Sequence, residues 1–404
     1  MSLDFDFFGN IAQRWREIHG NNSWQNLLDP IDIDLRRAII NYGELSQAAY
    51  DGFNGEYRSP NLGKPRYKRA HLLEKVQVSM PKAYEVTKYL YATASIHLPE
   101  VIKKAPVNTG SSNVQSNWMG FIAVATDEGK MWLGRRDIVV AWRGTQEVSE
   151  WLKDMDVTLV SASELVGPTT TGDEPSVHNG FLSIYTSDNL TSTITKQSAR
   201  DQALTEIARL MDLYSGEETS ITITGHSLGA AIATLNAIDI VSKNLNRSNY
   251  SFSKTCPVTA IAFASPRVGN SSFKNAFSQM SDLRLLRVRN VKDVVPNIPP
   301  PIRYTDIGVE LTIDVMKSPF IKGPGDVATW HDLESYMHGV AGWQKDGFNL
   351  VLNRDICLVN KFYDCLKEEY NIPVAWWVRH NKDMIKGDNG RWRLDDYDAD
   401  DDDI

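Results

Sequence analysis

The pattern that most directly indicates chemistry in this chain is the pentapeptide Gly225-His-Ser-Leu-Gly229. It follows the β-branched run 221–224 and precedes the alanine-rich stretch 230–237. This order predicts a strand, a tight turn and a helix, the context in which a G-x-S-x-G serine acts as a nucleophile. Both glycines would lie where a side chain collides with the strand or the helix. Ser227 would then occupy a strained turn with its hydroxyl open to a substrate. The alternative is a glycine-rich turn with an idle serine.

A serine hydroxyl needs a base to take its proton, and that base needs an acid to orient it. In α/β sheets that carry such a serine, the chain order is serine, acid, histidine, and the acid lies in a loop after a strand. Asp293 follows the predicted strand 283–289 in this way, whereas Asp282 precedes the strand and would lie at its other end. We therefore favour Asp293 as the acid and keep Asp306 as the alternative.

Two histidines follow Asp293 at a useful distance, His331 and His338. His331 is predicted to open a helix after the Gly-Pro-Gly loop at 323–325, so that its ring projects from a mobile connection. His338 is two turns further along, on the same predicted helix face. Each could instead be a histidine that only packs the helix against its neighbours. We favour His331 as the base.

Acyl transfer also needs hydrogen-bond donors for the oxyanion of the tetrahedral intermediate. The N–H of Leu228, directly after the serine, is one candidate, and the N-terminus of the following helix adds a favourable dipole. A second donor should come from the end of an earlier strand. Thr145, in Arg143-Gly-Thr145, fits that position and offers both an N–H and a hydroxyl. By itself this tripeptide is typical of an ordinary turn at a strand end.

These residues need a sheet to position them. Strand-like segments lie near 86–91 and at 118–125, 137–142, 220–224, 257–264 and 283–289, with helical stretches at about 180–213 and 228–243. The second and third segments, separated by Asp-Glu-Gly, are predicted to form a hairpin. Strands that alternate with helices of this length predict an α/β protein with a mostly parallel sheet and helices on both faces.

Beyond that core, the chain divides into segments of different character. We predict a helical leader or cap over 1–115, a catalytic core over 116–345, a C-terminal extension over 346–394 and a disordered acidic tail over 395–404. Within the core, the stretch 147–156 has an apolar face at helical spacing, formed by Val148, Trp151, Leu152 and Met155. This amphipathic stretch is either a surface helix or a lid over an acyl-binding cleft.

Charge and composition exclude several classes of function. The net charge is −8, but seven of the 51 acidic residues lie in the tail, which leaves 44 against 43 basic residues elsewhere. No basic footprint for nucleic acid is present. The three cysteines do not form a disulfide framework, and the cysteines and eight histidines show no metal-ligand spacing, so we expect no metal or cofactor. The N-terminus resembles neither a secretory signal nor a transit peptide, and the expected location is the cytoplasm.

Six motifs in a fixed order resemble those of the class 3, or fungal-type, lipases, and more closely the plant class II phospholipases A1. They are Ala141-Trp-Arg-Gly-Thr145, Val177-His-Asn-Gly-Phe181, Gly225-His-Ser-Leu-Gly229, Phe263-Ala-Ser-Pro-Arg-Val-Gly269, Asn290-Val-Lys-Asp-Val-Val-Pro296 and His331-Asp-Leu-Glu-Ser-Tyr336. The resemblance implies an α/β-hydrolase fold, with Ser227 as nucleophile, Asp293 as acid and His331 as base. It also implies oxyanion donors at Thr145 and Leu228 and a lid over 147–156.

The activity implied by this resemblance is hydrolysis of the sn-1 acyl ester of glycerophospholipids, with transient contact at a lipid surface. Two alternatives stay open. One is a triacylglycerol or galactolipid lipase with the same three residues. The other is a lipase-like interaction protein that does not need hydrolysis, although such plant proteins resemble this chain less because they carry a long helical C-terminal domain. The sequence does not indicate an oligomeric state.

Overall fold

The computed structural model of the chain describes residues 7–56, 59–93, 116–145, 156–167, 173–192, 194–247 and 255–377, the short strands β12 (Met384–Lys386) and β13 (Trp392–Leu394), and residue 398. Its centre is a seven-stranded sheet in the order β1-β2-β3-β6-β7-β8-β9. The first three strands pair antiparallel and the others parallel. The bounds are β1 Tyr84–Ala92, β2 Asn117–Ala125, β3 Arg136–Trp142, β6 Thr219–His226, β7 Val258–Phe263, β8 Leu283–Asn290 and β9 Val309–Ile313.

Helices cover both faces of this sheet because successive strand residues point to opposite sides. In β3, Val139 and Ala141 belong to one buried apolar cluster, whereas Ile138, Val140 and Trp142 belong to the other. The predicted α/β class, with a mostly parallel sheet between two helical layers, is confirmed. The central strand β6 is buried along its whole length, although threonine or serine alternates with isoleucine in it.

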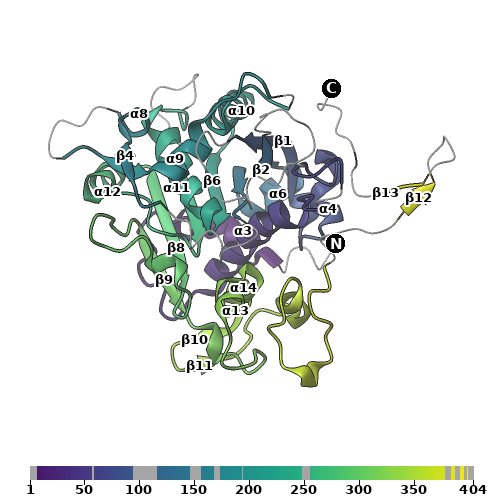
Figure 1. Cartoon of the computed structure of the whole chain (residues 1–404). Helices are drawn as coiled ribbons and strands as arrows, with labels where there is room; N and C mark the ends of the chain where they lie inside the picture. Colours follow the sequence, from purple (N-terminus) through teal and green to yellow (C-terminus); the bar gives the residue numbers. More distant parts are fainter. Residues whose placement is uncertain are drawn as a thin grey trace.

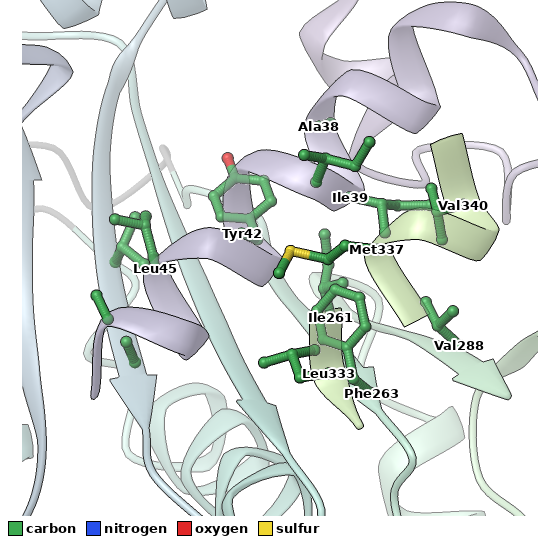
Figure 2. Close-up of a cluster of buried hydrophobic side chains, with 14 of the residues drawn as sticks. Ala38, Ile39, Tyr42, Leu45, Ile261, Phe263, Val288, Leu333, Met337 and Val340 are labelled. Carbon is green, nitrogen blue, oxygen red and sulfur yellow. The ribbon is translucent and has the colours of Figure 1, made fainter. Parts of the chain in front are cut away.

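One helical layer is built mainly from α3 (Ile33–Asp51) and α14 (Leu333–Gly342), with α2 (Ile11–Ile18) beside them. Figure 1 shows α3 and α14 next to each other near the middle of the molecule. In Figure 2, Ala38 and Ile39 of α3 face α14, and the two helices lie against β7 and β8. The side chains labelled there include Met337 and Val340 of α14, Ile261 and Phe263 of β7, and Val288 of β8.

The other layer is built from α8 (Ser163–Val166), α9 (Asn179–Thr186), α10 (Ala199–Leu213), α11 (Leu228–Ser242) and α12 (Ser271–Ser278). The central helix is α11, whose small residues let it lie directly on the strands. Ala230, Ala231, Ala233 and Ala237 are all fully buried. Alanine combines the highest helix propensity with the least bulk, so this helix approaches the sheet closely along its length.

Three details of the sheet and its connections differ from the sequence predictions. The strands β2 and β3 pair antiparallel, as the predicted hairpin requires, but the segment that connects them is the helix α6 (Asp127–Leu133). Thr126 caps its first turn and Gly134 ends it with φ 77°. The stretch 180–213 is two helices, α9 and α10, rather than one. The strand β9 was not predicted, because Glu310 and Thr312 interrupt its apolar pattern.

The remaining elements of the described chain are short. They are α4 (Leu72–Lys75), α13 (Val327–His331), the antiparallel pairs β4 (Leu159–Ser161) with β5 (Ser176–His178) and β10 (Trp343–Gln344) with β11 (Gly347–Phe348), and the 3₁₀ turns η1 (Arg69–His71), η2 (Pro81–Ala83), η3 (Val295–Asn297), η4 (Val315–Lys317), η5 (Ile356–Asn360) and η6 (Glu368–Tyr370). Among the described residues, no helix is long and apolar enough to cross a membrane. The three cysteines are free.

A buried ionic cluster joins the C-terminal extension to the leader and to α14. Arg354 pairs with Glu44 of α3 and, at 2.5 Å, with Glu334 of α14. Lys361 pairs with Asp51 of α3 at 2.5 Å. These five side chains are at most 10% exposed, and together they connect three segments that lie far apart in the sequence. Of the predicted acidic tail, only Asp398 is described: its N–H donates to the carbonyl of Arg66 at 2.9 Å.

Candidate active site

The turn that carries Ser227 connects β6 directly to α11 at the carboxyl edge of the sheet. Ser227 has φ 57° and ψ −126°, a strained conformation that residues with a side chain rarely adopt. A Cβ on Gly225 would lie 2.3 Å from the carbonyl oxygen of Gly229, and a Cβ on Gly229 would lie 2.3 Å from that of Trp142. The predicted strand-turn-helix order and the need for both glycines are confirmed.

The prediction that the Ser227 hydroxyl is open to a substrate is wrong for this conformation, in which the residue is 0% exposed. Thr145 and His331 are 5% and 3% exposed, so all three site residues are buried. A substrate can reach Ser227 only if neighbouring residues move. The predicted lid residues Val148, Trp151, Leu152 and Met155 lie outside the described residues.

The carboxylate of Asp293, in the turn after β8, accepts three hydrogen bonds. Nδ1 of His331 donates to its Oδ2 at 2.7 Å, and the hydroxyl of Tyr336 donates to the same oxygen at 2.7 Å. The N–H of Val295 donates to its Oδ1 at 2.9 Å. Burial, together with the negative charge of Asp293, holds the pKa of Tyr336 well above its ordinary value of 10. The tyrosine therefore stays protonated and keeps its donor directed at the carboxylate.

The alternative residues lie elsewhere. Asp282 precedes β8 and lies at the opposite end of that strand. Asp306 forms ion pairs with Arg267 and Arg287 at 3.0 and 2.6 Å. Nε2 of His338 bonds to the Ser318 hydroxyl at 2.7 Å, and burial lowers the pKa of His338 to about 3. Of the two histidines, it is His331 that contacts Asp293.

His331 does not open a helix, as the sequence predicted, but ends the short helix α13. The carboxylate of Asp326 caps α13 by accepting the N–H of Thr329 at 2.9 Å, and that of Asp332 caps α14 by accepting the N–H of Ser335 at 2.8 Å. His331 therefore lies at the junction of two capped helices. The two caps define where α13 ends and α14 begins on either side of this junction.

Two side chains hold the backbone around His331. The amide of Asn290, at the end of β8, donates to the carbonyl of Trp330 at 2.9 Å. Nε2 of His226, the residue before the candidate nucleophile, donates to the carbonyl of His331 at 2.8 Å. Burial, and then the neighbouring His331, hold the pKa of His226 well below its ordinary value of 6.5. His226 is therefore neutral at neutral pH.

The predicted oxyanion donors follow the carboxyl ends of two neighbouring strands, β6 and β3. Leu228 is the first residue of α11, so its N–H is one that the helix's own carbonyls leave unpaired. Thr145 follows β3, next to Gly144, whose added Cβ would lie 3.3 Å from that of Ser227. Arg143 holds this strand end, because its Nη1 donates to the carbonyl of Gly144 at 2.9 Å.

Three buried polar atoms of the described site lack a hydrogen-bond partner: Oγ of Ser227, Nε2 of His331 and Oγ1 of Thr145. Orphaned buried polar atoms are rare and costly unless a site uses them. Here they belong to residues with the chemistry of a nucleophile, a base and a donor. No group of metal-ligating side chains occurs among the residues that the structure describes.

Sequence reasoning assigned no role to Tyr336, His226 or Tyr50, all of which contact the site. Tyr336 could have been found, since it lies only five residues after His331 in the same short motif. His226 lies inside the pentapeptide itself. Tyr50 is far away in the sequence and carried no local signal.

Comparison with known proteins identifies the family. The family model for class 3 lipases matches residues 139–302. Phospholipase A1-II 1 from Oryza sativa subsp. indica is 56% identical over 395 residues, which cover 97% of this chain and 98% of that protein. The chain is a class 3 lipase of the phospholipase A1-II family. Phospholipase A1-II 2 from the same subspecies is 54% identical over 96% of this chain and 98% of its own length.

As a phospholipase A1-II relative, the chain is a serine ester hydrolase with an α/β-hydrolase fold, and the predicted family is confirmed. Among solved structures, the Lip2 lipase from Yarrowia lipolytica is similar, with a TM-score of 0.48 and 20% identity over 73% of this chain and 84% of that one. All of the leader and all of the C-terminal extension lie outside the region that the class 3 family model matches.

Proposed function

We propose that the chain hydrolyses the sn-1 acyl ester of glycerophospholipids through a Ser227–His331–Asp293 triad. The observation that carries the triad is the Asp293–His331 hydrogen bond of 2.7 Å, together with the free Nε2 of His331 and the free hydroxyl of Ser227. The sn-1 position and the phospholipid substrate are supported by relatives named phospholipase A1-II that share more than half of the sequence.

In the proposed reaction, Nε2 of His331 takes the proton of Ser227 as Oγ attacks the ester carbonyl. The oxyanion that forms is stabilised by donors at Leu228 and Thr145. His331 then gives its proton to the departing lysophospholipid oxygen, and an acyl-enzyme remains. Water, deprotonated by the same nitrogen, attacks the acyl-enzyme and releases the fatty acid and Ser227. Asp293 fixes the tautomer of His331 and stabilises its charged form throughout.

Because the proposed substrate is a lipid, the proposal includes transient contact with a lipid surface. Apolar side chains are exposed in the long loop between β8 and β9, near the candidate acid: Val291, Val294 and Ile302, of which Ile302 is 89% exposed. The bond between the N–H of Thr305 and the carbonyl of Gly269 attaches this loop to the segment after β7, at the carboxyl edge of the sheet. This is the edge where Ser227 lies.

The test is hydrolysis of phosphatidylcholine vesicles whose sn-1 and sn-2 chains carry different labels. The purified chain is expected to release the sn-1 label, and Ser227→Ala is expected to lose this activity by several orders of magnitude. Equal, negligible release by both proteins contradicts the enzymatic proposal. Release of the sn-2 label contradicts only the regiospecificity. Hydrolysis of triacylglycerol or galactolipid in preference to phosphatidylcholine would favour the alternative, a triacylglycerol or galactolipid lipase.

A further inference from the structure

We propose that Tyr50, from the leader helix α3, is a positioning residue that sets the geometry of the oxyanion strand end, the nucleophile turn and the catalytic base together. The inference rests on the triad and oxyanion roles proposed above. It goes beyond them because Tyr50 lies almost 90 residues before the segment that the class 3 family model matches. It assigns a catalytic purpose to a part of the chain whose role would otherwise be structural.

The hydroxyl of Tyr50 contacts both sides of the site. It accepts the N–H of Gly144 at 3.1 Å, directly before the candidate oxyanion residue Thr145. It bonds to Nδ1 of His226 at 2.9 Å, directly before Ser227. One oxygen therefore joins the end of β3 to the turn after β6.

The directions of these bonds follow from counting hydrogens. Nε2 of His226 faces the carbonyl of His331, which can only accept, so Nε2 carries the proton. Since burial keeps His226 neutral, its Nδ1 carries no proton and must accept. The hydroxyl hydrogen of Tyr50 is thus donated to Nδ1, and its oxygen is left to accept from Gly144. The carbonyl of His226, 3.4 Å from the same hydroxyl, is a longer second acceptor.

The packing around Gly144 shows how closely these groups meet. A Cβ on Gly144 would lie 2.3 Å from the Tyr50 hydroxyl, 2.6 Å from the carbonyl of His226 and 3.3 Å from Cβ of Ser227. The ring of Tyr50 packs edge-on to that of His226, with centroids 5.8 Å apart, and the ring of His226 lies 4.5 Å from that of His331. A displaced Tyr50 would therefore move the donor, the nucleophile and the base relative to one another.

The end of α3 that carries Tyr50 is itself held. The next residue, Asp51, is buried and pairs with Lys361 of the C-terminal extension, and Gln47 donates to Asp51 at 2.9 Å. The leader and the C-terminal extension therefore meet one residue away from Tyr50. Loss of the hydroxyl should lower the rate of the chemical step rather than substrate binding, because a misplaced oxyanion donor costs transition-state stabilisation.

The experiment compares Tyr50→Phe with Tyr42→Phe. Tyr42 lies on the same helix, is more deeply buried than Tyr50 and donates one strong hydrogen bond, to Asp137 at 2.7 Å, but does not contact the site. With a soluble short-chain ester, Tyr50→Phe is expected to lower kcat by about 10- to 100-fold with KM nearly unchanged, somewhat less than the loss of a whole oxyanion donor. Affinity for an alkylboronic acid, which mimics the tetrahedral intermediate, should fall by a similar factor.

Tyr42→Phe is expected to lower the thermal midpoint at least as much as Tyr50→Phe while leaving kcat within about twofold. If Tyr50→Phe has the same kcat as the wild type, or if the two variants lose kcat equally, the inference about Tyr50 is overturned. The proposed triad is not affected by that result. If Ser227→Ala retains activity on the same ester, the proposed triad fails and the inference fails with it. The soluble ester makes the result independent of which lipid is the natural substrate.

Discussion

The roles of single residues in this site depend on which hydrogen bonds are made and which are left open. The carboxylate of Asp293 accepts hydrogen bonds from His331, Tyr336 and Val295, whereas Oγ of Ser227 and Nε2 of His331 have no partner. Three donors hold this carboxylate in one orientation, which is what an orienting acid needs. In the proposed reaction a proton leaves Oγ of Ser227 and is taken up by Nε2 of His331, and these are the two atoms without a partner.

At this scale, His331 and His338 give a direct test of the base. His331→Ala is expected to lower kcat/KM on a soluble ester by at least about a thousandfold, since the nucleophile then has no proton acceptor. His338→Ala is expected to change kcat/KM by less than about tenfold, because His338 bonds to Ser318 and not to Asp293. Steady-state kinetics on both purified variants provides the measurement. Comparable losses in the two would contradict the assignment of His331.

The residue roles that the sequence predicted are those tied to a local pattern. The turn at Ser227 was predictable because the glycines, the β-branched strand and the alanine-rich helix are contiguous. Asp293 was predictable from its place after a strand. The contact of Tyr50 with His226 was not, because the two residues are 176 positions apart and nothing local marks either. Burial of the Ser227 hydroxyl also depends on the surrounding fold, which a motif does not describe.

At the scale of elements, the sequence predicted most central strands and the long helix α11 correctly. The missed helix α6 did carry a local signal, since Thr126 before an acidic first turn and Gly134 after it are typical helix boundaries. The strand β9 carried a weaker local signal in the sequence. Glu310 and Thr312 suggest a loop until Glu310 is seen to pair with Arg287 and Arg289 of the adjacent strand β8. Such cross-strand compensation is visible only in three dimensions.

The buried ionic cluster that connects α3, α14 and the C-terminal extension supports a prediction about stability. Arg354→Met would leave Glu44 and Glu334 buried without their cation, although Ser79 still bonds to Glu44 and Lys361 lies 3.8 Å from Glu334. Removing one partner of a buried ionic pair typically costs about 3–5 kcal/mol. We therefore expect a loss of that order in the free energy of unfolding, measured by chemical denaturation.

The control for this prediction is Lys345→Met, which removes an ion pair with Asp29 whose side chains are 71% and 56% exposed. Water already solvates both groups there, so no measurable change is expected. Because α14 begins next to His331, Arg354→Met should also lower the thermal midpoint of activity. An Arg354→Met protein as stable as the wild type would mean that the ionic cluster does not hold the extension.

At the scale of the whole molecule, burial keeps four histidines neutral within the part of the chain that the structure describes. The pKa values of His19 and His226 lie well below the ordinary 6.5, and those of His178 and His338 are lowered to about 4 and about 3. In the unfolded chain the same side chains would take up protons near pH 6.5. Below that pH the unfolded state therefore binds more protons than the native state, and protonation favours unfolding.

Stability should consequently be highest above about pH 6.5 and fall as the pH drops from 6.5 towards 4, before the carboxylates with lowered pKa values begin to contribute. Each such histidine adds up to about 1.4 kcal/mol per pH unit to the slope of the unfolding free energy. Denaturant unfolding at pH steps from 7.5 to 4.5 measures the slope. His338→Gln should reduce it by one proton. A flat profile between pH 7 and 5 would show that these histidines are protonated in the native state, and the neutral His226 on which the Tyr50 hydrogen-bond chain depends would then be in doubt.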